Sequence, residues 1–75
     1  MVMAYILISI SESDLLEVVA TIRAIPHVRQ AHALLGPTDC IALIACENHE
    51  ILRDTILRVR AAKGVTSTDT RYVYD

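Results

Sequence analysis

The 75-residue chain has no tryptophan, no phenylalanine and no long apolar segment. Its only two glycines, Gly36 and Gly64, are far apart, which excludes a glycine-rich loop that could cradle a phosphate. The apolar runs fall far short of the roughly 18 residues that a membrane span requires, and no basic segment precedes an apolar one at the N-terminus. The sequence therefore indicates neither a membrane span nor a signal peptide, and we expect a cytoplasmic protein.

An excess of positive charge is also absent, because nine acidic residues outnumber seven basic ones and the net charge is −2. The basic residues form no stripe, and neither a helix-turn-helix nor an aromatic pair for stacking bases accompanies them. We expect no direct nucleic-acid binding. The histidines His27, His32 and His49 form no catalytic constellation with neighbouring nucleophiles or acids, so we predict no catalytic residue and no cofactor.

Two cysteines, Cys40 and Cys46, fall on one predicted strand. At about 20 Å apart on the same face they exceed the roughly 7 Å limit between Cα atoms in a disulfide. They also lack the close ligand spacing of a zinc site. We predict two free, buried cysteines and no metal.

Two segments, Met3–Ile10 and Cys40–Cys46, are apolar at both odd and even positions. Side chains alternate between the faces of a strand, so both faces of these strands need a covering layer. A chain of this length has too few elements to cover both faces of a sheet, and its core is marginal without association. We therefore expect a homodimer.

Turn and cap signals divide the rest of the chain. Ser11 to Asp14 has the form of a capping box, and Pro26 ends the helix that follows. Asn48 is the expected cap of a second helix, and Gly64 suits a left-handed position just past its end. The predicted order is strand Met3–Ile10, helix from Ser11 to Pro26, strand Val28–Leu35, strand Cys40–Cys46, helix Asn48–Gly64 and strand Val65–Tyr74.

The two halves of this order repeat each other, since pairs such as Ile22 with Val59 and Val28 with Val65 are 37 residues apart. A duplicated split βαβ unit predicts a ferredoxin-like βαββαβ fold, a single α+β domain over residues 1–75. The first and third strands are then central, both helices cover one face, and a second copy covers the other in a face-to-face dimer. The uncovered side chains are expected to be Met3, Tyr5, Leu7, Ile41, Leu43 and Ala45, or their alternates.

The segment from Val28 to Ile41, with Gly36 and then Asp39 before a buried strand, resembles the effector domain of the Lrp/AsnC regulators, the RAM domain. The resemblance extends over nearly the whole chain: it includes the opening strand and the closing Gly64-Val65 with the threonines that follow. It implies a small-molecule sensor, usually of amino acids, whose ligand binds where dimers meet in a larger ring.

In such domains the turn between the second and third strands supplies main-chain groups to the charged ends of the ligand. The resemblance places that role on Gly36, Thr38 and Asp39, with Thr68 and Thr70 as neighbouring hydroxyl candidates. Physically, Gly36 lets a ligand approach the backbone, and Asp39 can pair with an ammonium group. The family usually joins this domain to a helix-turn-helix, so the chain is similar to stand-alone modules, with full-length Lrp/AsnC regulators as possible partners in mixed assemblies.

Two alternatives stay open from the sequence. One is another regulatory module of the same fold, such as the ACT-like amino-acid-binding domains of biosynthetic enzymes. The other is a small dimeric enzyme of the monooxygenase type, which needs a polar cavity between helices and sheet, whereas the predicted inner positions are almost all aliphatic. The sequence does not name the ligand, because a turn that holds ammonium and carboxylate groups leaves the side chain unspecified.

Overall fold

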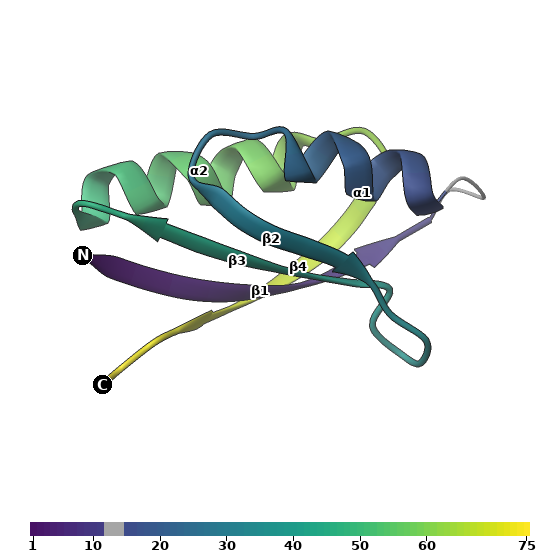
Figure 1. The fold of residues 1–75 in the computed structure, drawn as a ribbon. Helices are drawn as coiled ribbons and strands as arrows, with labels where there is room; N and C mark the ends of the chain where they lie inside the picture. Colours follow the sequence, from purple (N-terminus) through teal and green to yellow (C-terminus); the bar gives the residue numbers. More distant parts are fainter. Residues whose placement is uncertain (12–14) are drawn as a thin grey trace.

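The fold is a four-stranded antiparallel sheet covered on one face by two helices (Figure 1), as the computed structural model describes it for residues 1–11 and 15–75. The spatial strand order β2-β3-β1-β4 and the chain order βαββαβ confirm the predicted ferredoxin-like fold. The expected capping box extends into residues 12–14, outside the described residues. The elements are β1 Val2–Ile10, α1 Leu15–Arg23, β2 Val28–Ala33, β3 Cys40–Cys46, α2 His49–Ala61 and β4 Val65–Tyr72.

The two strands that are apolar on both faces, β1 and β3, are central, and β2 and β4 form the edges. Strand β1 pairs with β3 in a register that sets Tyr5 opposite Leu43 and Leu7 opposite Ile41. On its other side β1 pairs with β4, with Leu7 opposite Asp69. The polar residues thus fall on edge strands, where unpaired backbone groups meet water.

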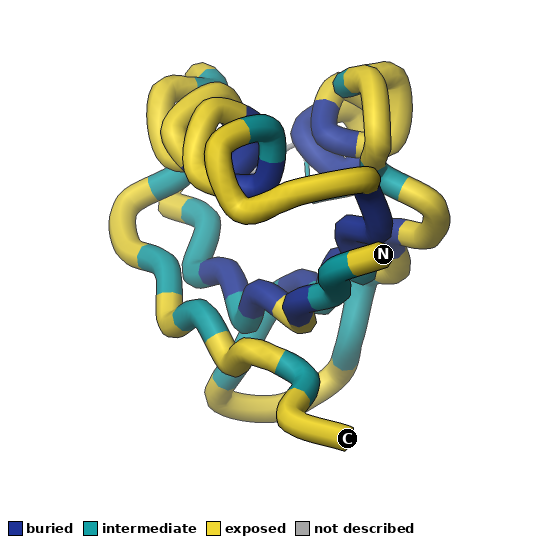
Figure 2. Tube along the Cα trace, turned by 90° about the vertical axis from the view of Figure 1, so that its left-hand side faces the viewer, coloured by how far each residue is buried: buried dark blue, intermediate teal, exposed yellow. Residues whose placement is uncertain are grey.

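The core lies between the sheet and the helices, which run side by side above it (Figure 2). The buried face of α2 consists of Leu52, Thr55, Ile56 and Val59, and Asn48 caps the helix as predicted, by accepting a 2.9 Å hydrogen bond from the Ile51 backbone N–H. The only buried polar side chain described is Thr55, whose hydroxyl donates to the Ile51 carbonyl at 2.8 Å. The buried apolar side chains of this layer include Ala4, Ile6, Ile8, Val19, Ile22, Ile44, Leu52, Ile56 and Val59.

The link from α1 to β2 differs from the prediction in detail. Helix α1 ends at Arg23, because Pro26 disfavours helical geometry in the residue before it. His27, directly before β2, adopts a left-handed conformation with φ of 75°. Gly64, 37 residues later, has φ of 94° at the equivalent point before β4. The internal repeat therefore includes the turn, with a histidine where the second half has a glycine.

The face of the sheet away from the helices is uncovered in the single chain. Of the two sets of side chains left open by the sequence, the structure places Met3, Tyr5 and Leu7 on this face, beside Ile41 and Leu43 on β3. Tyr5 is 42% exposed even though it lies at the centre of the sheet. We call this surface, including Ala45, the open face.

Both cysteines are free and buried at β3, as predicted. Their side chains belong to the same helix-facing core, and burial raises the pKa of the Cys40 thiol. Within the described residues, no group of three or more His, Cys, Asp or Glu side chains could hold a metal ion. Cys40 and Cys46 therefore contribute to packing.

Candidate functional site

The connection from β2 to β3 projects beyond the sheet on the side away from the helices (Figure 1). Gly36 in this loop has φ of 132°, a conformation that side-chain-bearing residues rarely adopt. A Cβ built on Gly36 would meet no atom within 4 Å, so the glycine is required by its backbone conformation and not by crowding. Its backbone is consequently open to a ligand or to a second protein chain.

Asp39 fixes the base of this loop to the end of β1. Its backbone N–H donates to the Ile8 carbonyl at 3.1 Å, and its carbonyl accepts from the Leu34 N–H at 2.8 Å. Its carboxylate oxygen Oδ2 accepts a 2.8 Å hydrogen bond from the Ile10 N–H. Asp39 therefore has a structural role that the sequence did not reveal, while Oδ1 accepts no hydrogen bond from any described residue.

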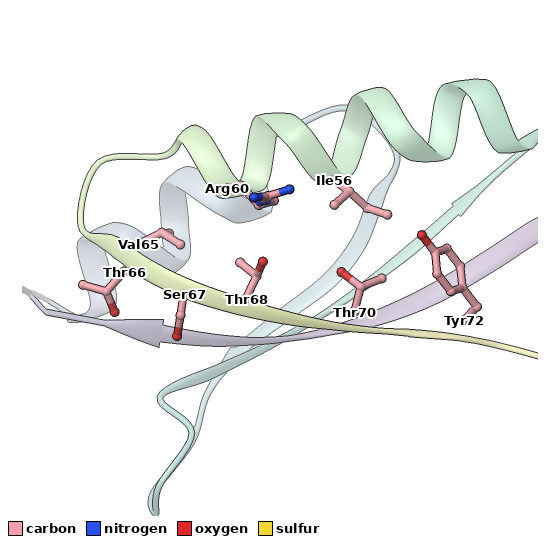
Figure 3. Close-up of a pocket in the computed structure, with 8 residues that line it drawn as sticks. All are labelled: Ile56, Arg60, Val65, Thr66, Ser67, Thr68, Thr70 and Tyr72. Atoms are coloured by element: carbon pink, nitrogen blue, oxygen red, sulfur yellow. The ribbon is translucent and has the colours of Figure 1, made fainter.

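A second candidate region is a groove between α2 and β4 with a volume of about 640 Å³ (Figure 3). The hydroxyls of Thr68, Thr70 and Tyr72 point from β4 toward α2, whereas the Ser67 hydroxyl points away from it. Arg60 lies on the facing turn of the helix. We call this the α2–β4 groove; its lining residues are Ile56, Arg60, Val65, Thr66, Ser67, Thr68, Thr70 and Tyr72.

The alternation of β4 separates its charges from its hydroxyls. Thr68 and Thr70 pair with Ile8 and Ile6, which face the helices. Asp69 and Arg71 point to the open face, where they form an exposed ion pair with an Nη2 to Oδ2 distance of 2.9 Å. The hydrogen bonds from Arg71 lower the pKa of Asp69. The charges of β4 therefore neutralise each other outside the groove.

The predicted site residues do not form one pocket within the chain. Asp39, at the base of the loop that contains Gly36 and Thr38, lies beside the end of β1, whereas the groove that contains Thr68 and Thr70 is lined by α2 and β4 alone. Strand β1 separates the two regions in the sheet. Within one chain, the groove therefore includes no residue of the β2–β3 loop.

Sequence reasoning overlooked two groove residues, Arg60 and Tyr72. Simple spacing could have found both: Arg60 follows Ile56 by one helical turn, and Tyr72 follows Thr70 by two positions on a strand. Neither residue stands out by type alone, since an arginine near a helix C-terminus is common. The topology brings the two residues to one groove.

Comparisons with known proteins agree with this fold. The sequence family of the Lrp/AsnC ligand binding domain matches residues 3–75. No curated protein matches the chain in sequence. Among solved structures, TTHA0845 from Thermus thermophilus superposes with a TM-score of 0.90 at 25% identity, covering 100% of this chain and 95% of its own. The hypothetical protein PHS023 from Pyrococcus horikoshii also has a TM-score of 0.90 at 25% identity, covering 100% of this chain and 92% of its own.

A longer relative was solved with a ligand. The transcriptional regulator NMB0573 from Neisseria meningitidis, crystallised as an L-Met complex, matches with a TM-score of 0.83 and 25% identity. The match covers 99% of this chain and 50% of the regulator. The chain is thus a ferredoxin-like domain with the same fold as part of this regulator. The chain belongs to the Lrp/AsnC ligand-binding domain family, as its sequence predicted. No described helix is long and apolar enough to cross a membrane.

Proposed function

We propose that this chain is an amino-acid-sensing effector domain that acts in transcriptional or metabolic regulation without binding DNA itself. The observation that carries the proposal is the match of the Lrp/AsnC ligand-binding family over residues 3–75. A second support is the L-Met complex of the Neisseria regulator, in which a relative binds an amino acid. The open backbone at Gly36 supports a contact to the main chain in this region.

In this proposal the β2–β3 loop holds the charged ends of the ligand. Gly36 and Thr38 supply backbone and hydroxyl groups to the carboxylate, and Oδ1 of Asp39 accepts from the ammonium group. The hydrogen bond from Ile10 to Oδ2 orients the Asp39 carboxylate and leaves Oδ1 available. Thr68 and Thr70 come from the groove of another copy, because β1 separates them from the loop of their own chain.

A second copy of the chain is the partner that we propose for the open face. The molecule measures 34 × 20 × 17 Å. A face of that length and width offers on the order of 700 Å² per protomer, close to the roughly 800 Å² of a standard interface. Its centre is apolar, and the ion pair of Asp69 and Arg71 lies at its edge. The same proposal includes larger rings of dimers and mixed assemblies with full-length Lrp/AsnC regulators.

Ligand binding is favoured over the enzymatic alternative by the contents of the core. A monooxygenase-type site needs an enclosed polar cavity between helices and sheet, but the fully buried side chains of the described core are aliphatic apart from Thr55 and two cysteines. The hydroxyl of Thr55 is already engaged by the Ile51 carbonyl. The polar groups that are open to a ligand lie outside this buried core, in the β2–β3 loop and in the α2–β4 groove beside the edge strand β4.

The test is a thermal-shift screen against the twenty amino acids, with assembly size measured by light scattering in the same samples. A ligand at 100 times its dissociation constant should raise the free energy of unfolding by about 2.7 kcal/mol. Asp39→Asn removes the charge but keeps an oxygen for the Ile10 N–H, so the fold should persist while affinity falls roughly 5- to 30-fold. Asp54→Asn on α2 is the matched control.

Two results would reject the proposal: no amino acid changes either the melting temperature or the assembly size, or Asp39→Asn binds as tightly as the unmodified chain. The absence of DNA binding is tested separately. With net charge −2, the purified chain should not retain a random duplex at about 0.15 M salt. Salt-sensitive retention below micromolar concentration would contradict that part.

A further inference from the structure

The α2–β4 groove contains one charged side chain, Arg60, and no acidic one among the described residues that line it. Arg60 forms no ion pair with any described residue, unlike Arg71, which is neutralised by Asp69 on the other face of the sheet. Thr68, Thr70 and Tyr72 make no side-chain hydrogen bond to the described residues either, and their hydroxyls point toward the helix (Figure 3). The groove therefore presents a guanidinium and three hydroxyls without partners in the described part of the chain.

These groups match one ligand chemistry. A guanidinium binds a carboxylate through two parallel N–H donors, and a neighbouring hydroxyl can donate to the same oxygens. The position of Arg60 in the last turn of α2 is favourable for any cation, because the C-terminus of a helix is the negative end of its dipole. The dipole accounts for the charge, but it does not account for the row of hydroxyls along the groove, from Thr68 below Arg60 to Tyr72 beyond Ile56 (Figure 3).

The apolar residues and the volume of the groove limit the size of the ligand that it can hold. Ile56 and Val65 line it beside the polar groups, and its volume of about 640 Å³ is within the range of small-molecule sites. A short methylene chain can lie against Ile56 while a terminal carboxylate reaches Arg60, one helical turn further along. A long apolar side chain would leave the guanidinium and the hydroxyls without partners.

We propose that the α2–β4 groove binds the side-chain carboxylate of an acidic amino acid, with Arg60 as the residue that determines specificity. This inference rests on the proposed function, because it assumes that the loop of another copy holds the backbone ends of the same ligand. It adds the ligand class: aspartate or glutamate is preferred over asparagine, glutamine and the aliphatic amino acids.

The experiment is isothermal titration of the chain with L-aspartate, L-glutamate and their amides, asparagine and glutamine. The acid should bind about 10- to 100-fold more tightly than its amide, since the amide replaces a charge-assisted contact with a neutral one. Arg60→Gln should remove that preference while changing amide binding less than about twofold, and Arg60→Lys should restore part of it. Arg53→Gln is the control, because it makes the same charge change on the same helix outside the groove.

Succinate and glutarate separate this inference from the proposed function, because they carry carboxylates but no ammonium group. If they stabilise the chain and Arg60→Gln abolishes the effect, the groove is a carboxylate site even when no amino acid binds. If instead an aliphatic amino acid binds, depends on Asp39 and is indifferent to Arg60→Gln, the sensing function stands and the acidic specificity is wrong. Equal binding of acids by Arg60→Gln and the unmodified chain also overturns it.

Discussion

The substitution Leu43→Asp distinguishes a dimer from a monomer, because the structure shows which face of β3 bears this side chain. Leu43 lies on the open face, opposite Tyr5 on β1 and Gln30 on β2. In an isolated chain the new carboxylate would remain in water, and the cost would be at most about 1 kcal/mol from the low strand propensity of aspartate. In a face-to-face dimer the same carboxylate would be trapped between two sheets.

The magnitude in the dimer is much larger. Burial of one leucine side chain contributes roughly 1.5–3 kcal/mol, and an unpaired buried carboxylate costs several kcal/mol more. Even a net loss of about 4 kcal/mol would weaken the dimer roughly a thousandfold. A dimer that is stable at nanomolar concentration would then dissociate in the micromolar range.

Sedimentation equilibrium, with circular dichroism of the same samples, measures both consequences. We expect the unmodified chain to be a dimer or a larger assembly, and Leu43→Asp to be a monomer with reduced stability or to unfold. Leu16→Asp is the control, since Leu16 is 72% exposed on α1, away from the open face. A folded monomer of the unmodified chain at micromolar concentration, with Leu43→Asp equally stable, would refute the reasoning.

Three further predictions concern single elements. His27→Gly should stabilise the chain by about 0.5–1 kcal/mol, because relief of the left-handed strain exceeds the entropy cost of glycine. Gly64→Ala should destabilise the chain by about 1 kcal/mol for the converse reason. Chemical denaturation measures both changes, and stabilisation by Gly64→Ala would contradict this account. Asn48→Ala should cost about 1 kcal/mol in the same assay through loss of the α2 cap, and an unchanged midpoint would disprove that role. Cys40 and Cys46 are both buried, and burial also raises the pKa of the Cys40 thiol, so iodoacetamide near pH 8 should modify the two cysteines only after unfolding. Rapid labelling of the native chain would show that the core opens.

Much of the fold follows from the pattern of apolar residues. Strands that are apolar on both faces have to be central, and polar ones such as β4 have to be edges, so strand order could be predicted without coordinates. The end of α1 was harder to place, because Pro26 acts on residues before it and ends the helix at Arg23. The left-handed His27 could not be foreseen from residue type, because glycine is the usual residue there. Only the repeat with Gly64 indicates it.

The candidate site was harder to predict, because it depends on how distant segments meet. The loop residues were found from a resemblance in a local segment, and local segments reveal turn geometry such as that of Gly36. The hydrogen bond from Ile10 to Asp39 joins positions 29 residues apart, so no local pattern predicts it. Arg60 and Thr68 likewise come from a helix and a strand whose relative register only the packed structure defines. In the proposed site, substitution of Asp39 weakens binding through the loop and substitution of Arg60 weakens it through the groove, so a ligand whose affinity depends on both residues is expected to lie between two copies of the chain.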